Sequence, residues 1–171
     1  AHTPDSAKII WYGIDVDTQQ WSKDRLYCCA RNVQTTPQGT QFELYSSWGK
    51  QQVRLSLVGQ FNVYNALAAT GAVLALGTRF GDLLSGLSAL VPVPGRMELF
   101  SQPELASVIV DYAHTPDALA HALVAAAMHT DGDVWCVFGC GGQRDKGKRP
   151  QMGKITSPKS KQVGWTAEHT P

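Results

Sequence analysis

The chain has 171 residues, of which 43% are hydrophobic, and its 15 basic and 14 acidic side chains leave a formal net charge of +1. This length allows one ordinary domain or two small ones with a buried core. The nearly neutral charge gives no reason to expect nucleic acid or an anionic membrane surface as a partner.

The first part of the chain is predicted to be rich in β-strands. Runs of Val, Ile, Tyr, Phe and Trp occur at 9–15, 26–34, 40–48 and 52–59, and the turn sequences TPQG and WGKQ interrupt them. A helical spacing of apolar residues follows over 61–77, with Asn62 as the expected N-cap. A second helix is expected over 80–90.

A domain boundary is predicted near Pro94, because VPVPGRME places two prolines and a glycine close together. Beyond it, the sequence predicts two buried strands, ELASVIVDY and DVWCVFG, on either side of a helix. Thr115 is the expected N-cap of this helix and Pro116 its first residue. Strand, helix and strand at this spacing predict a βαβ unit with parallel strands.

The pattern is not continued after Ile155, where the sequence becomes polar and contains proline. We therefore expect 156–171 to be a divergent, disordered tail without a further strand. Two parallel strands do not make a stable sheet, so the second domain is expected to be truncated.

The four cysteines do not have the spacing of a secreted disulfide framework, which favours a cytoplasmic location. They are the adjacent pair Cys28 and Cys29, and Cys136 and Cys140 around a strand end. Cys136 and Cys140 have no second Cys or His pair at metal-ligand spacing, so we interpret them as small buried hydrophobes. No metal site is predicted.

Asp111 and His114 lie at the carboxyl end of a predicted strand, where ligands gather in α/β folds. Such an acid can accept hydrogen bonds from ribose or metal-bound water, and the imidazole can donate to phosphate or carry a proton. The alternative is that Asp111 caps the next helix and His114 is a surface residue.

The loop FGCGGQRDKGKRP follows the next predicted strand and combines glycines with Arg144 and other basic residues. It fits a phosphate or carboxylate site, because arginine can hold a planar carboxylate with two parallel hydrogen bonds. A glycine turn followed by a solvated basic face is the alternative. Asn62 and Asn65 lie near a helix start, where capping explains Asn62 better than Asn65.

Four motifs in this order, GQFNVYNALAA, PGRME, VDYAHTPDAL and WCVFGCGGQRDKGKRPQMG, closely resemble the Mur ligases, and within them the MurE type. The resemblance extends to about Ile155. It implies that 1–94 is the end of a central ATPase-type α/β domain with a β-rich section, and that 95–155 starts a Rossmann-like parallel-sheet domain.

The resemblance implies an ATP-dependent, magnesium-dependent amide ligase of peptidoglycan synthesis in the cytoplasm. ATP would activate the carboxylate of a UDP-linked muramoyl dipeptide, and an amine of the incoming diamino acid, meso-diaminopimelate or lysine, would attack it. These small molecules are the partners implied, with no nucleic acid and no membrane, and the protein is expected to be a monomer.

The resemblance also implies roles for individual residues. Asn62 and Asn65 match asparagines near the adenine, Arg96 an arginine near the nucleotide, and Asp111 an acid near the ribose. His114 matches a histidine with a supporting phosphate or structural role. Arg144 matches an arginine that contacts the carboxylate of the incoming amino acid.

Two motifs of the resembled family are absent from the 171 residues: the phosphate loop GTNGKT, expected before Ala1, and DNPR, expected after Ile155. We therefore expect the chain to be an inactive fragment of a ligase. The alternatives are a folylpolyglutamate or cyanophycin-type ligase of the same superfamily, and a non-catalytic module that binds a nucleotide or a partner.

Overall fold

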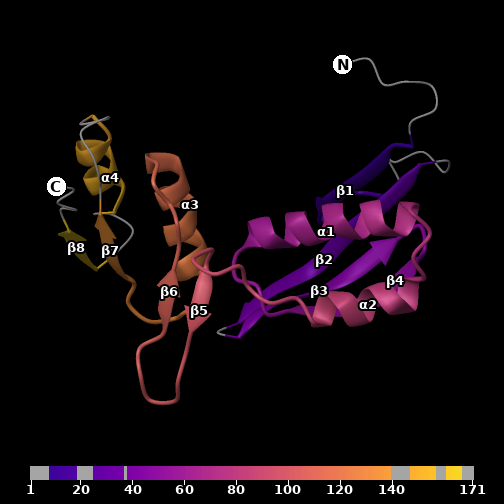
Figure 1. The fold of residues 1–171 in the computed structure, drawn as a ribbon, viewed down its shortest axis with the longest axis horizontal. Helices are drawn as coiled ribbons and strands as arrows, with labels where there is room; N and C mark the ends of the chain where they lie inside the picture. The colour runs from indigo at the N-terminus through magenta and orange to yellow at the C-terminus, as the bar shows by residue number, and fades with distance from the viewer. Residues whose placement is uncertain (1–7, 19–24, 37, 140–146, 157–160, 167–171) are drawn as a thin grey trace. The chain divides into compact units, whose positions relative to one another are not determined.

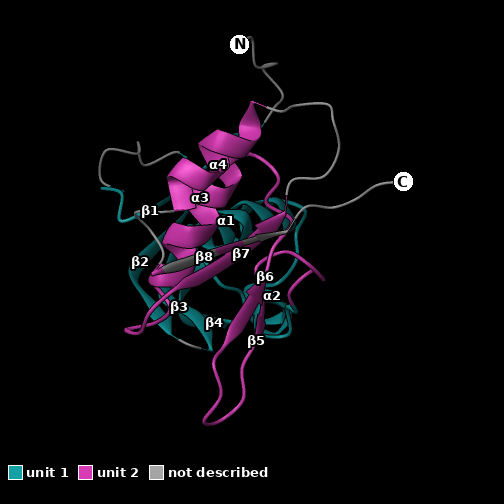
Figure 2. Ribbon diagram, turned by 90° about the vertical axis from the view of Figure 1, so that its left-hand side faces the viewer, with its two compact units in different colours: residues 1–91 teal, residues 92–171 magenta. Residues whose placement is uncertain are grey.

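The computed structural model describes residues 8–18, 25–36, 38–139, 147–156 and 161–166. The chain divides into two compact units, Ala1–Val91 (unit 1) and Pro92–Pro171 (unit 2), which Figure 2 shows in different colours. Both units combine strands with helices, which confirms the predicted α/β fold class. None of the helices described is long and apolar enough to cross a membrane.

Unit 1 is built on a four-stranded sheet of order β1-β2-β3-β4. Its strands overlap the four predicted runs: β1 (Ile10–Ile14), β2 (Leu26–Thr36), β3 (Gly39–Ser46) and β4 (Gly49–Leu55). β1 is parallel to β2, whereas β2, β3 and β4 form an antiparallel meander. The β2–β3 connection falls in the predicted TPQG turn.

Helices α1 (Gln60–Ala75) and α2 (Phe80–Ser88) pack against this sheet (Figure 1). Alternate strand residues point toward them, because successive side chains of a strand face opposite sides of the sheet. The resulting core contains Phe42 and Val53 from the sheet, Leu67 from α1 and Leu87 from α2, each no more than 5% exposed.

The expected N-cap of α1 was wrong by three residues. Gly59 is the N-cap, with a φ of +94° that glycine adopts without strain. The helix can therefore begin earlier than the apolar spacing indicates. Asn62 lies in its first turn instead, where its side-chain amide donates to the Val58 carbonyl oxygen at 2.8 Å.

The described residues of unit 2 form two small sheets. β5 (Glu98–Phe100) and β6 (Val108–Val110) pair antiparallel, and β7 (Trp135–Gly139) and β8 (Gln162–Thr166) pair parallel. Helices α3 (Pro116–Ala127) and α4 (Lys148–Thr156) share a second core with β7, made by Leu119, Leu123, Cys136 and Met152.

The predicted parallel pairing across α3 is wrong for the described residues. β6 pairs with β5, because these strands are close in sequence and closing the short connection between them costs little chain entropy. The parallel βαβ unit lies one step later, as β7, α4 and β8. The strands are also less buried than predicted, since Val108 in β6 and Val137 in β7 are 54% and 75% exposed.

The expectation of a tail without a strand is also wrong. β8 lies within 156–171 and pairs with β7 from Trp135↔Gln162 to Gly139↔Thr166. Next to it, the Lys161 amide donates to the Val134 carbonyl oxygen at 2.9 Å. Residues 157–160 and 167–171 lie outside the described part of the chain. The five-residue run QVGWT is too short and too close to polar residues to be recognised as a strand by composition alone.

The predicted start of α3 is confirmed. Thr115 is the N-cap, and its hydroxyl oxygen accepts a hydrogen bond from the Ala118 amide at 3.2 Å, while Pro116 is the first helical residue.

Thr115→Ala should therefore destabilise unit 2 by about 1 kcal/mol, because an amide of the first turn loses its partner. Thr115→Ser keeps the hydroxyl and serves as the matched control. Urea unfolding followed by the exchange protection of α3 amides measures both variants. Equal stability of the two variants would contradict a capping role.

Candidate functional site

Two carboxylates hold the PGRME segment at the start of unit 2. Glu98 Oε2 accepts a hydrogen bond from the Gly95 amide at 2.8 Å, and Asp111 Oδ1 accepts one from the Met97 amide at 2.9 Å. Gly95 and Met97 have φ values of +68° and +45°, and a positive φ is unfavourable for methionine. The hydrogen bond to Asp111 and the burial of the Met97 side chain offset this cost. The backbone on both sides of Arg96 is therefore anchored.

The Arg96 side chain lies against an aromatic ring. Its guanidinium carbon is 4.7 Å from the ring centroid of Tyr112, which is within the range of a cation–π contact. Since Tyr112 follows Asp111 in the chain, the same short segment binds the backbone beside Arg96 and supports its side chain. Arg96 and Asp111 are thus brought together within unit 2.

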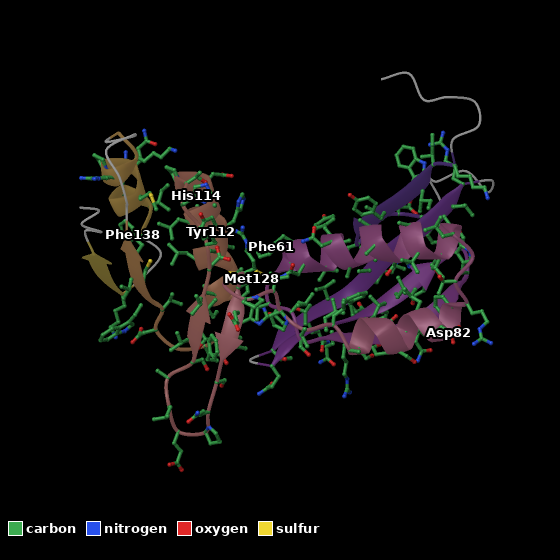
Figure 3. The ribbon with its side chains drawn as sticks, in the orientation of Figure 1. Phe61, Asp82, Tyr112, His114, Met128 and Phe138 are labelled. Carbon is green, nitrogen blue, oxygen red and sulfur yellow. The ribbon has the colours of Figure 1, made fainter. Side chains whose placement is uncertain are left out.

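His114 belongs to the same cluster. Its ring centroid is 5.2 Å from that of Tyr112, with the two planes 58° apart, and Figure 3 shows both side chains. His114 Nδ1 is 3.1 Å from the Tyr112 carbonyl oxygen. A carbonyl oxygen can only accept, so Nδ1 carries the proton in this contact. In the neutral ring Nε2 is then an acceptor, and only the protonated ring can donate from Nε2 to an anion.

We call Arg96, Asp111, Tyr112 and His114 the β6 cluster, because they gather where β6 ends. All four residues are exposed. The cluster combines a carboxylate that can accept from sugar hydroxyls with a cation that can bind phosphate. One alternative for Asp111 is excluded, since Thr115 caps α3 and Asp111 binds the Met97 amide instead.

Asn62 and Asn65 form a pair on α1 in unit 1. The Asn65 side-chain amide donates to Asn62 Oδ1 at 3.3 Å, and Asn62 in turn donates to the Val58 carbonyl oxygen. These bonds engage both polar ends of the Asn62 side chain, whereas Asn65 is exposed. Phe61 precedes Asn65 by one helical turn and is 40% exposed (Figure 3). The exposed Asn65 amide can form hydrogen bonds with a planar ligand such as a nucleobase.

Arg144 and Cys140 lie outside the described residues. The structure describes β7, which ends at Gly139, and α4, which begins at Lys148. The proposed role of Arg144 thus remains a prediction from the sequence.

The described cysteines have the character of structural thiols. Cys28 and Cys29 are fully buried and Cys136 is 7% exposed. Burial, with a smaller contribution from the neighbouring Cys29, raises the pKa of Cys28 to about 12, and burial also raises the pKa of Cys136. Since the thiolate is the reactive form and the metal ligand, these shifts oppose both roles.

The described residues do not offer a magnesium site. Within the described ranges no three His, Cys, Asp or Glu side chains lie close enough together to hold a metal ion. His121 is 3.5 Å from Asp117 on the surface of α3, and His129 is buried.

Tyr112 is the part of the cluster that sequence reasoning missed. An aromatic residue in a loop is usually assigned to packing, and Tyr112 lies between two residues that attract attention for their charge. The run Asp-Tyr-x-His, immediately after an apolar strand, is the sequence signal that could have indicated Tyr112. It places an aromatic ring between an acid and a histidine at the end of a strand.

Comparison with known families agrees with this organisation. The family model of the Mur ligase middle domain matches residues 4–73, and that of the Mur ligase, glutamate ligase domain matches residues 95–170. The second match includes the segment that we expected to be divergent.

Individual relatives support the same assignment. The chain is 48% identical over 130 residues to the UDP-N-acetylmuramoyl-L-alanyl-D-glutamate–2,6-diaminopimelate ligase of Janthinobacterium sp. (strain Marseille). The matched region covers 74% of this chain and 26% of that protein. A solved structure of a ligase with the same name is 36% identical, with a TM-score of 0.63, and covers 82% of this chain and 29% of that one.

A more distant structure shares the fold. UDP-N-acetylmuramate-alanine ligase MurC from Thermotoga maritima has a TM-score of 0.70 at 22% identity, covering 92% of this chain and 34% of that one. The chain thus spans between a quarter and about a third of these relatives. The chain belongs to the Mur ligase family and carries sequence of both its middle domain and its C-terminal, glutamate ligase domain.

Proposed function

We propose that this chain is part of an ATP-dependent amide ligase of the MurE type. The ligase would join a diamino acid, meso-diaminopimelate, to UDP-N-acetylmuramoyl-L-alanyl-D-glutamate in peptidoglycan synthesis in the cytoplasm. The choice of diaminopimelate rests on the similarity of this chain to two diaminopimelate ligases. Magnesium belongs to the proposal only through the family, because the described residues do not fit a metal.

The observation that carries the nucleotide part of the proposal is the β6 cluster. Asp111 has one carboxylate oxygen on the Met97 amide, and its second oxygen can accept from a ribose hydroxyl. Arg96, anchored beside it, supplies a positive charge for phosphate. Asn62 and Asn65 would contact the adenine, with Asn65 the more exposed of the two.

Substitution of Asp111 tests the nucleotide site. Asp111→Asn keeps an oxygen for the Met97 amide and removes the charge. Hydrogen bonds to charged groups contribute about 1.5–3 kcal/mol, so we expect the dissociation constant for ADP to rise by about tenfold or more. Calorimetric titration of the chain with ADP measures it.

A comparison with Asp111→Ala separates binding from structure. Asp111→Ala removes both the carboxylate and the hydrogen bond that anchors Met97, whereas Asp111→Asn keeps an acceptor for that bond. We expect Asp111→Ala to weaken ADP binding at least as much as Asp111→Asn and to reduce the exchange protection of the Met97 amide, which Asp111→Asn preserves. Unchanged ADP affinity in Asp111→Asn would contradict the assignment of Asp111 to the ribose.

The 171-residue chain by itself is expected to form no tripeptide product. Catalysis of phosphoryl transfer depends on groups that hold the γ-phosphate and its metal. The 171 residues do not include the motif GTNGKT, and the described residues include no cluster of side chains that could hold a metal ion. A phosphate-release assay with ATP, magnesium, the muramoyl dipeptide and diaminopimelate should remain at background. Turnover above background that is lost in Asp111→Ala would contradict this expectation.

A further inference from the structure

We propose that Tyr112 is a positioning residue that holds the Arg96 guanidinium and the His114 imidazole in place for a nucleotide phosphate. This inference rests on the proposed function. Tyr112 touches both side chains, with Arg96 over its ring at 4.7 Å and the His114 ring centroid at 5.2 Å. One ring therefore links two residues that come from different segments of unit 2.

The exposure of Tyr112 argues against a role in the core. The side chain is 63% exposed, so it buries little apolar area and contributes little to folding. None of the described residues hydrogen-bonds its hydroxyl group. What the structure uses is the ring, whose negative face attracts the guanidinium.

A fixed Arg96 would bind phosphate better than a free one. An arginine side chain has many rotamers, and part of this conformational entropy is lost when a ligand immobilises the guanidinium. Contact with Tyr112 restricts the side chain beforehand, and the hydrogen bonds of Gly95 and Met97 already fix the backbone on either side. His114 is restricted by its contact with the Tyr112 ring and also by its Nδ1 contact with the Tyr112 backbone carbonyl oxygen, which every substitution at this position keeps.

Three variants separate the ring from the rest of the side chain. Tyr112→Phe keeps the ring and removes the hydroxyl, whereas Tyr112→Leu keeps apolar bulk and removes the ring. Phe100→Leu removes another exposed ring of unit 2 and is the matched control, since Phe100 is 52% exposed and lies outside the β6 cluster. Thermal unfolding verifies that each variant is folded.

The first measurement needs no nucleotide. In NMR spectra of the chain, the Arg96 Nε–H proton and the His114 ring protons should show ring-current shifts from Tyr112. We expect these shifts to persist in Tyr112→Phe and Phe100→Leu and to move to values of free side chains in Tyr112→Leu. Unchanged shifts in Tyr112→Leu would overturn the proposal.

The second measurement is titration with ADP. An exposed cation–π contact supports an effect of about threefold to fivefold, so Tyr112→Leu should weaken ADP binding by that factor while Tyr112→Phe restores the affinity of the unmodified chain. Equal affinity in Tyr112→Leu and the unmodified chain would overturn the link to the nucleotide. If the unmodified chain bound no ADP, the proposed function would fail for this chain, and the NMR shifts would still decide whether Tyr112 holds Arg96 and His114.

Discussion

Phe42→Ala is expected to lower the free energy of unfolding of unit 1 by about 3–5 kcal/mol, the usual cost of removing a buried aromatic ring from a core. Phe42 is 1% exposed in β3, where it lies opposite Val53 of β4 in the register. Its core also includes Leu67 and Leu87 from the two helices. A ring deleted here leaves a cavity bordered by several elements, so a partial collapse cannot easily fill it.

The expected loss is large compared with the 5–15 kcal/mol that stabilises a typical domain. Urea unfolding monitored by amide exchange gives the stability of unit 1 and unit 2 separately. Tyr12→Ala is the matched control, because it deletes a ring that is 48% exposed on β1. A loss below about 1 kcal/mol in Phe42→Ala would contradict the placement of this side chain in a close-packed core.

The same experiment tests the division into two units. Unit 2 has its own core, formed by Leu119, Leu123, Cys136 and Met152. We expect the exchange protection of β7 to remain unchanged in Phe42→Ala. A parallel loss of protection in β7 would show that unit 2 depends on unit 1 for its stability.

Arg144→Lys is expected to raise the KM for the diamino acid by about tenfold or more, or about 1.4 kcal/mol, in a ligase that contains these residues with the remaining family domains. The resemblance assigns Arg144 to the carboxylate of the incoming amino acid. Lysine keeps the positive charge but loses the planar pair of donors that holds a carboxylate at two points. The KM for ATP should change little.

Steady-state kinetics with each substrate varied in turn measures both constants. Arg54→Lys, an exchange at an exposed position of β4 in unit 1, is the control for a loss of guanidinium geometry away from the site. An increase in the KM for ATP instead would show that the loop between β7 and α4 binds phosphate.

Local signals in the sequence predicted much of the secondary structure. The start of α3 is determined by neighbouring residues, because the Thr115 hydroxyl, the fixed φ of Pro116 and the apolar spacing act within one helical turn. The strands of unit 1 are recognisable because runs of β-branched and aromatic residues are separated by turn sequences. The family was also identifiable from four motifs and their order, and the later comparisons confirm it.

Strand pairing could not be predicted in the same way. The sequence indicated strands near Val108–Val110 and Trp135–Gly139, and it favoured pairing them with each other. In the structure they pair with β5 and β8, neither of which has a strong local signal. A strand of three to five residues becomes identifiable only when a neighbour satisfies its backbone hydrogen bonds.

The candidate site was likewise predicted only in part from the sequence. The sequence by itself determined which residue types follow β6, and it singled out Asp111 and His114 for their chemistry and their place at a strand end. Only the tertiary structure decided that Asp111 anchors the Met97 amide, and that Arg96 and His114 meet on the ring of Tyr112. These contacts join residues up to 16 positions apart, from Arg96 to Tyr112. The spacing of residues along a chain does not determine such contacts, because they depend on how the antiparallel pairing of β5 and β6 brings the two segments together.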